Sequence, residues 1–252
     1  MSSLSCLKRE NAPDLAYVYV PATGAGKSLP VVMFCGGFKS DMEGTKALYL
    51  EEQCAERGQG FIRFDYRGHG QSEGKFIDGT IGLWKQDALD ILNHISPESV
   101  VLVGSSMGGW IVLLLMEACP DKIAGLIGIA AAPDFTKSFY NDELTAQLKQ
   151  ELAEKGFVHL PNDYSDEPYI ITKTLIDDGD DNLFMDQQHS FSAPVHLIQG
   201  MKDADVPWQT AHRIKNVIDG DVVVTLIEDG DHRLSRPQDL ELLDKSVQDI
   251  TA

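Results

Sequence analysis

The sequence has few positive charges. Its 252 residues include 21 Lys and Arg against 39 Asp and Glu, which gives a formal net charge of −18 at pH 7. Phosphate backbones and anionic lipid headgroups would repel such a chain, because both are bound through clustered Lys and Arg. We therefore expect no nucleic acid partner. Hydrophobic residues make up 43% of the chain, as in an ordinary globular protein.

Cysteine and long apolar segments are also scarce. The four cysteines, Cys6, Cys35, Cys54 and Cys119, form no CxxC pair, so we expect buried or half-buried reduced thiols and neither zinc nor a redox site. No segment approaches the ~20 apolar residues that span a bilayer, and residues 1–10 lack the apolar core of a secretory signal. The expected location is cytoplasmic, without stable membrane insertion.

Short apolar runs alternate with helical patterns along most of the chain. The runs are apolar on consecutive positions, as in strands buried on both faces. They lie at residues 15–20, 30–35, 60–66, 99–104, 123–130, 195–200 and 222–227. The helical patterns lie at residues 44–57, 79–94, 107–118, 208–218 and 237–250. Strand followed by helix, repeated, predicts a single α/β domain over residues 1–252, with a mostly parallel central sheet and helices on both faces.

The alternation is interrupted once, between Pro133 and Pro194. This stretch carries two amphipathic helical patterns and the acidic run at 177–181. We expect residues 133–193 to form a small helical lid insertion above the ends of the strands, the alternative being a pair of ordinary packed helices. Its aromatic residues suit either the core of a lid or contacts with an acyl chain. They include Phe135, Phe139, Tyr140, Phe157, Tyr164, Tyr169 and Phe184.

The most informative segment is Gly104-Ser105-Ser106-Met107-Gly108. It lies between an apolar strand pattern and an apolar helix pattern, which is the context of a nucleophile elbow, a sharp turn that exposes a serine hydroxyl. Gly104 and Gly108 leave room for that turn. The N–H of Met107 would lie at the positive end of the helix dipole, where it would stabilise an oxyanion. The alternative is a turn that only caps a buried helix.

A serine hydroxyl is a weak nucleophile unless a histidine takes its proton and a carboxylate orients that histidine. Asp203 follows one late strand pattern, with Asp205 as the alternative carboxylate, and His232 follows the next. The order of residue types and their positions after strands predict a catalytic triad of Ser106, Asp203 and His232. Taken singly, the aspartate has an ordinary alternative as a helix cap and the histidine as a solvated ion-pair partner.

A second oxyanion donor is expected in Gly36-Gly37-Phe38, directly after the strand pattern at 30–35. Two residues without Cβ let the backbone approach the site closely. The N–H of Phe38 is therefore the expected partner of the N–H of Met107, and the Phe38 ring could also line an acyl pocket. The alternative is a tight turn into the following segment.

No cofactor and no metal are expected. The run TGAGKS at 23–28 ends like a phosphate-binding loop, but the first glycine of that motif would fall at Pro21 and a strand pattern follows. A polar hairpin loop is the expected structure. The remaining histidines show no metal-ligand spacing. They are His69, His94, His159, His189, His196 and His212.

With these segments in place, the chain resembles the α/β-hydrolase family over nearly its whole length. The run FDYRGHGQS at 64–72 resembles the segment that follows the family's fourth strand. More narrowly, GTKA at 44–47, GSSMGGW at 104–110, GMKDADVPW at 200–208 and DHR at 231–233 resemble the mitochondrial acyl-protein thioesterases, also known as acyl-glucuronide esterases. The resemblance implies the α/β-hydrolase fold, with Ser106 as nucleophile, Asp203 as acid and His232 as base.

Two features depart from the family. Gly36 stands where many such hydrolases have the histidine of a His-Gly pair, which leaves the backbone donor intact. The N-terminal residues lack the Arg-rich composition of a mitochondrial presequence, so the mitochondrial location is not carried over.

The expected function is a serine hydrolase that cleaves carboxylic esters or thioesters through an acyl-enzyme on Ser106. The resemblance favours S-acyl thioesters or acyl glucuronides, and hence a small-molecule or acylated-protein substrate. Two alternatives remain: a ligand-binding relative with little turnover, and a hydrolase of peptide or C–C bonds.

Overall fold

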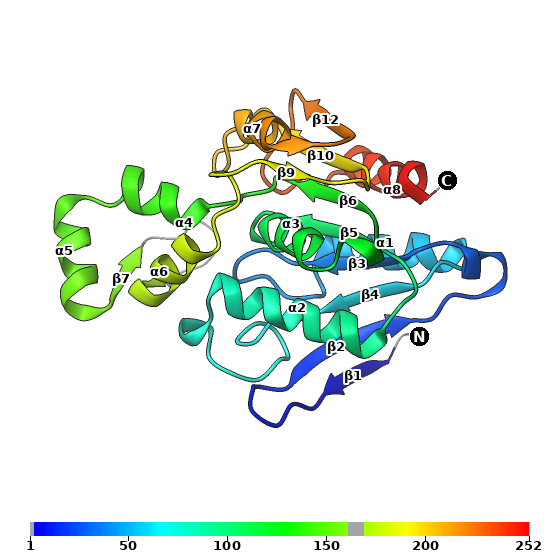
Figure 1. Ribbon diagram of the computed structural model, residues 1–252, viewed down its shortest axis with the longest axis horizontal. Helices are drawn as coiled ribbons and strands as arrows, with labels where there is room; N and C mark the ends of the chain where they lie inside the picture. Colours follow the sequence, from blue (N-terminus) through cyan, green and yellow to red (C-terminus); the bar gives the residue numbers. More distant parts are fainter. Residues whose placement is uncertain (1–2, 161–168, 252) are drawn as a thin grey trace.

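The computed structural model describes residues 3–160 and 169–251 (Figure 1). Eight strands form one sheet in the order β1-β2-β4-β3-β5-β6-β10-β12. Their bounds are β1 Leu4–Leu7, β2 Leu15–Val20, β3 Val31–Cys35, β4 Phe61–Phe64, β5 Val100–Ser105, β6 Ile123–Ile129, β10 Val195–Gly200 and β12 Val222–Ile227. Every neighbouring pair from β4 to β12 is parallel, and β2 and β1 extend the sheet antiparallel. The predicted mostly parallel sheet is confirmed.

Helices enclose the sheet on both faces (Figure 1). Their bounds are α1 Thr45–Glu56, α2 Ile81–Ile95, α3 Met107–Ala118, α7 Gln209–Val217 and α8 Pro237–Thr251. In β5, Leu102 packs in the core with α2 and α3, whereas Val101 and Val103 pack in the core with α1 and α8. Alternate residues of a strand face opposite sides, so the predicted coverage of both faces is confirmed. Within the described residues, no helix is both long and apolar enough to cross a membrane.

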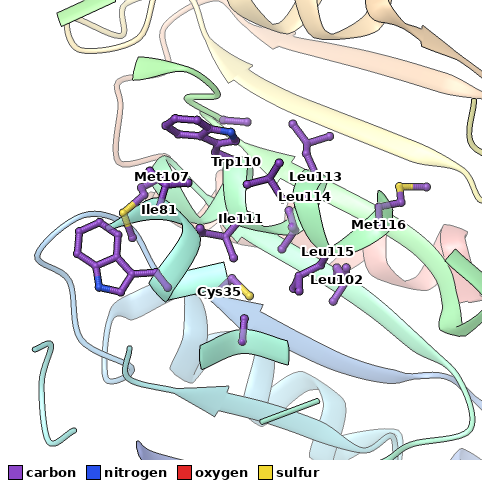
Figure 2. Packing of buried hydrophobic residues seen from close by; sticks show 14 of the residues in the cluster. Cys35, Ile81, Leu102, Met107, Trp110, Ile111, Leu113, Leu114, Leu115 and Met116 are labelled. Carbon is purple, nitrogen blue, oxygen red and sulfur yellow. The ribbon is translucent and has the colours of Figure 1, made fainter. Parts of the chain in front are cut away.

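Helix α3 is buried along residues 107–116. Figure 2 shows Ile111 and Leu115 of this helix packed over Cys35 of β3 and Leu102 of β5. Burial of one large aliphatic side chain contributes roughly 1.5–3 kcal/mol. Core packing on all sides therefore holds the N-terminus of α3 in place.

Strand β1 is an edge strand that the apolar patterns did not predict. Its residues alternate between exposed and half-buried, so no consecutive apolar run marks it. Cys6 in this strand is exposed, which corrects the expectation that all four cysteines are buried or half-buried. Cys35 and Cys54 are buried, Cys119 is half-buried, and all four thiols are free.

The segment expected to be a polar hairpin loop is a short 3₁₀ helix, Gly24–Ser28. It joins β2 to β3, and these strands are not neighbours because β4 lies between them. The hairpin prediction was therefore wrong, since a hairpin joins paired strands. A Cβ at Gly26 would overlap the Gly58 carbonyl, so close backbone packing explains this glycine.

The expected insertion lies between β6 and β10. Where two helical patterns were expected, its described residues form three α-helices, a π-helical turn and a hairpin, β7–β8, that the patterns did not predict. Its elements are α4 Phe135–Ser138, a π-helical turn Phe139–Glu143, α5 Ala146–Lys155, β7 Phe157–Leu160, β8 Tyr169–Thr172, α6 Lys173–Asp181 and β9 His189–Ser190, which pairs with β11 Ile218–Asp219. In Figure 1, α5 and β7 project away from the sheet. Residues 161–168, and with them Tyr164, lie outside the described part.

Hydrogen bonds anchor the base of the insertion to the sheet-covering helices. The Trp110 indole of α3 donates to the Asn182 carbonyl at 3.0 Å. The Asp178 carboxylate of α6 accepts the Gly82 N–H of α2 at 2.7 Å. The end of the insertion that follows α6 is tied to its beginning, because Asp134 accepts the Phe184 N–H at 2.7 Å. The projecting part, α5 with β7 and β8, thus extends from a fixed base.

Candidate active site

Ser106 occupies the turn between β5 and α3 in a strained backbone conformation. Its φ is 55° and its ψ is −118°, a region that residues with a Cβ rarely adopt. Backbone hydrogen bonds hold it there: its N–H donates to Ile129 at 2.9 Å, and its carbonyl accepts from Gly109 at 2.8 Å and Ala132 at 3.1 Å. This sharp turn presents the Ser106 side chain at the C-terminal edge of the sheet.

The two glycines that flank Ser106 are required by close backbone packing. A Cβ at Gly104 would overlap the Gly108 carbonyl oxygen, and a Cβ at Gly108 would overlap the Cys35 carbonyl oxygen. Backbone atoms inside a packed core cannot move aside cheaply. The Gly-x-Ser-x-Gly spacing is therefore a steric condition of this turn.

The structure brings together Ser106, His232 and Asp203 from three loops that follow β5, β12 and β10. His232 Nε2 lies 3.1 Å from Ser106 Oγ, and His232 Nδ1 lies 2.9 Å from Asp203 Oδ2. An ionised carboxylate only accepts hydrogen bonds, so the proton of the neutral imidazole lies on Nδ1. Nε2 is then free to accept the serine hydroxyl proton.

The Asp203 side chain is fully buried. Burial raises the pKa of its carboxyl, but hydrogen bonds from His232 and from the amides of Val206 and Asp205 outweigh burial and leave the pKa below its usual value. Asp203 is therefore a carboxylate at neutral pH, able to stabilise a charge on His232.

Asp205 was the alternative acid, and the structure places it differently. Its nearest carboxylate oxygen is 4.0 Å from His232 Nδ1, against 2.9 Å for Asp203. Its side chain is 45% exposed. A longer distance and a more solvated carboxylate both weaken its interaction with the imidazole.

Asp203, Asp205 and His232 also offer potential metal-ligand atoms within 4.8 Å of one another, a grouping that the sequence did not indicate. In the tautomer described above, His232 Nδ1 carries a proton and is not a ligand. The hydrogen bond to Asp203 already accounts for the position of His232 Nδ1. The expectation of no metal and no cofactor stays a prediction.

Gln199 is a site residue that the sequence patterns did not reveal. It is 1% exposed at the end of β10, and its Nε2 donates to Asp203 Oδ2 at 2.9 Å and to the Val206 carbonyl at 3.2 Å. Gln199 thus fixes the carboxylate from the side opposite the two loop amides. A polar residue near the end of a largely apolar strand, just before the acid loop, was the available sequence signal.

The loop with the expected second oxyanion donor lies against the elbow. A Cβ at Gly37 would lie 3.3 Å from the Ser105 carbonyl oxygen and 3.4 Å from Ser106 Cβ. Phe38 follows directly, and Met107 is the first residue of α3, where N–H groups have no partner within the helix. The loop and the start of α3 therefore both lie beside Ser106, and the oxyanion hole formed by the N–H groups of Phe38 and Met107 stays a prediction.

Lys46 connects α1 to the histidine loop, a contact that the sequence patterns did not predict. Its ammonium group donates to the carbonyl of Arg233, the residue after His232. Burial lowers the Lys46 pKa to about 8, against the opposing effects of the carboxylates of Asp231 and Asp239. The loop that carries His232 is thus held from the face of the sheet that α1 covers.

The lowered pKa of Lys46 predicts that the stability of the protein depends on pH. An exposed lysine has a pKa of 10.5, so as the pH rises the folded state loses this proton before the unfolded state does. Between about pH 8 and about pH 10.5 the unfolded state binds more protons than the folded state. As the pH increases through this window, the free energy of unfolding of the wild type should therefore rise relative to that of Lys46→Met. Below that window the difference between the two proteins should be constant.

Urea unfolding of both proteins at about pH 7 and about pH 10 measures this difference. Substitution of the exposed Lys27 by Met is the matched control, and it should show no such change. A wild-type advantage that falls or stays level as the pH rises would contradict the assignment.

Comparison with known proteins places these observations in a family. The sequence model of the serine aminopeptidase family S33 matches residues 26–178. The human protein palmitoyl-protein thioesterase ABHD10, mitochondrial, is 38% identical over 251 residues, which cover 99% of this chain and 80% of the human protein. A crystal structure of a protein from Agrobacterium vitis S4 is 40% identical with a TM-score of 0.94, covering 100% of this chain and 99% of that chain. The mouse alpha/beta hydrolase domain-containing protein 10 is 36% identical with a TM-score of 0.89 over 98% of each chain.

The match to the family model includes the elbow and ends before the loops that carry Asp203 and His232, whereas the three relatives are similar over nearly the whole chain. The fold and the narrower resemblance that the motifs implied are both confirmed. The chain belongs to the α/β-hydrolases, in the family described as serine aminopeptidase S33.

Proposed function

We propose that this protein hydrolyses carboxylic esters or thioesters through an acyl-enzyme on Ser106. One observation carries the proposal: the continuous hydrogen-bonded line from Ser106 Oγ through His232 to the buried Asp203 carboxylate. A general base within 3.1 Å of a hydroxyl on a strained elbow is the arrangement that activates a serine.

In the first half-reaction, His232 Nε2 takes the hydroxyl proton while Ser106 Oγ attacks the carbonyl carbon. The carbonyl oxygen becomes an oxyanion, which accepts hydrogen bonds from the N–H groups of Phe38 and Met107. The imidazolium, stabilised by Asp203, then gives its proton to the departing alcohol or thiol, and the acyl group remains on Ser106.

In the second half-reaction, water attacks the acyl-enzyme. His232 takes a proton from the water as the new bond forms, and it returns that proton to Ser106 Oγ as the carboxylic acid leaves. The enzyme is regenerated, and no oxidant, reductant or metal enters the balance.

Thioesters with a long acyl chain are the proposed substrate class. The human and mouse relatives are named palmitoyl-protein thioesterases, which supports an acylated protein or a small thioester as substrate. Aromatic side chains add support, because the Phe38 ring lies 5.7 Å from the ring of Phe135 in α4 and 5.8 Å from that of Tyr169 in β8. These rings bring apolar surface from the insertion to the loop beside Ser106.

The same contacts support a lid role for residues 133–193 within a single domain of residues 1–252. Two elements of the insertion touch the proposed oxyanion loop, so a shift of the insertion would change access to Ser106. The human and mouse thioesterases are named mitochondrial, whereas the cytoplasmic location of this chain stays a prediction.

Steady-state hydrolysis of a matched series from acetyl to palmitoyl, each as an oxygen ester and as a thioester, tests the proposal. We expect Ser106-dependent turnover in which kcat/KM rises with chain length on thioesters. Activity confined to short oxygen esters would replace the thioesterase proposal by a small-pocket esterase. Amino-acid anilides in the same panel test the peptidase activity that the family description names. No turnover on any substrate would favour a ligand-binding protein.

A further inference from the structure

His69 is a buried histidine to which the reaction above gives no task. It belongs to the loop after β4 and is 4% exposed. Its Nδ1 lies 3.2 Å from the Arg67 carbonyl oxygen, and its Nε2 lies 3.2 Å from the backbone nitrogen of Lys39. Lys39 directly follows Phe38, so His69 touches the loop with the proposed oxyanion donor.

These two contacts determine the protonation state of His69. A carbonyl oxygen only accepts hydrogen bonds, so Nδ1 must carry a proton; a backbone N–H only donates, so Nε2 must carry a lone pair. The ring is therefore the neutral Nδ1–H tautomer. Burial lowers the His69 pKa to about 4, against the opposing effects of the Arg67 carbonyl and of Asp87, whose charge is paired with Arg67. His69 thus keeps this state throughout the neutral pH range.

The N–H that His69 accepts belongs to a turn in an unfavourable conformation. The Ser40 N–H donates to the Gly37 carbonyl at 3.1 Å, which closes a β-turn with Phe38 and Lys39 at its centre. Lys39 has a φ of 58°, as the third residue of a type II turn requires. Glycine is preferred there, and a lysine adopts this conformation only at a cost in free energy, because its Cβ crowds the backbone.

In a type I turn, Lys39 would have a negative φ and no backbone strain. The change from type II to type I rotates the peptide between Phe38 and Lys39, and this rotation would carry the Lys39 N–H away from His69. The His69 hydrogen bond therefore favours the observed turn over its relaxed alternative. Aromatic contacts also hold the Phe38 and His69 rings close to each other. The ring centroid of Phe76 lies 4.8 Å from that of Phe38 and 5.1 Å from that of His69. The ring centroid of Trp84 lies 5.9 Å from that of Phe38 and 5.2 Å from that of His69.

We propose that His69 is a positioning residue of the oxyanion loop. Its Nε2 holds the Lys39 N–H and thereby fixes the Gly37–Ser40 turn, in which Phe38, the residue with the proposed oxyanion donor, directly precedes Lys39. Loss of this bond would let the turn relax and shift the Phe38 backbone. This role rests on the proposed function. His69 does not touch the reacting atoms, and it acts only through the backbone that it holds.

A matched pair of variants separates this role from simple packing. In His69→Gln, the side-chain amide reaches the position of Nε2, so its oxygen can still accept the Lys39 N–H. In His69→Asn, the shorter amide reaches only the position of Nδ1, so it keeps the bond to Arg67 and loses the bond to Lys39. Asn leaves a larger cavity than Gln at this buried position. Loss of packing alone would therefore appear as a lower melting temperature of His69→Asn, whereas loss of the bond to Lys39 would appear as a lower kcat in protein that stays folded.

We expect His69→Asn to lower kcat on a short oxygen ester about 10- to 100-fold while KM stays within about twofold. This loss is smaller than the ~10²–10³-fold effect of deleting an oxyanion donor, because the Phe38 N–H is loosened and not removed. His69→Gln should recover most of kcat. The melting temperatures of both variants show whether either loss comes from unfolding.

A second measurement does not depend on turnover. The ¹⁵N shifts of the His69 ring should show a proton on Nδ1 only, and amide exchange at Lys39 should be faster in His69→Asn than in the wild type or in His69→Gln. A wild-type kcat in His69→Asn, equal kcat losses in both variants, or an Nε2–H tautomer would overturn the proposal. Failure of the proposed function would instead appear as wild-type turnover that does not depend on Ser106.

Discussion

Replacing Ser106 with Ala should lower kcat by about 10⁴- to 10⁶-fold on any ester or thioester that the wild type hydrolyses. Ser106 Oγ is the only protein atom that bonds covalently to the acyl carbon in the proposed pathway. Without it, His232 and Asp203 have no nucleophile to activate, and only oxyanion stabilisation and binding remain. KM should change little, because one hydroxyl contributes little to binding of an acyl chain.

Ser105→Ala is the matched control for this experiment. Ser105 is the last residue of β5, buried at 8% exposure, and it has no place in the proposed pathway. The control should keep kcat within a few-fold of the wild type. Mass spectrometry after a rapid quench should detect an acyl group on Ser106 in the wild type and in Ser105→Ala. Turnover by Ser106→Ala at the wild-type rate would show that the nucleophile lies elsewhere.

The core of the fold could be predicted because its elements carry simple periodic patterns. The strand patterns at 195–200 and 222–227 coincide with β10 and β12, and the helix pattern at 107–118 coincides with α3. Strand β10 and helix α3 are largely buried, and an element buried on all sides requires consecutive apolar residues. Strand β12 lies at the edge of the sheet with only Val222 buried, so its apolar run predicted the strand correctly and its burial on both faces wrongly. The order of these elements then placed three loops at one edge of the sheet.

The missed elements lack that pattern for physical reasons. Strand β1 and the hairpin of β7 and β8 are short and only partly buried, so their stability depends on pairing with a neighbour and not on an apolar run. The supporting contacts of Lys46 with Arg233 and of His69 with Lys39 join residues that lie far apart in the sequence, on different segments of the fold. Sequence spacing carries no information about such contacts, whereas the loop positions of Ser106 and His232 follow from the order of strands alone.

The two aspartates of the acid loop should respond very differently to replacement by asparagine. Each Asp203 oxygen has two donors: Oδ1 accepts the amides of Asp205 and Val206, and Oδ2 accepts Gln199 Nε2 and His232 Nδ1. In Asp203→Asn, an NH₂ group at the Oδ1 position would face two backbone donors that cannot turn away. It must therefore take the Oδ2 position, where Gln199 can rotate its amide to accept.

That placement makes the new amide a donor to His232 Nδ1, which moves the imidazole proton to Nε2. The ring then cannot accept the Ser106 proton, and we expect kcat to fall about 10⁴-fold for Asp203→Asn. Asp205→Asn removes only a partly exposed charge 4.0 Å from the same nitrogen, so kcat should stay within a few-fold of the wild type. Steady-state kinetics of the two variants on one substrate decide between the carboxylates, because a larger loss in Asp205→Asn would assign the acid to Asp205.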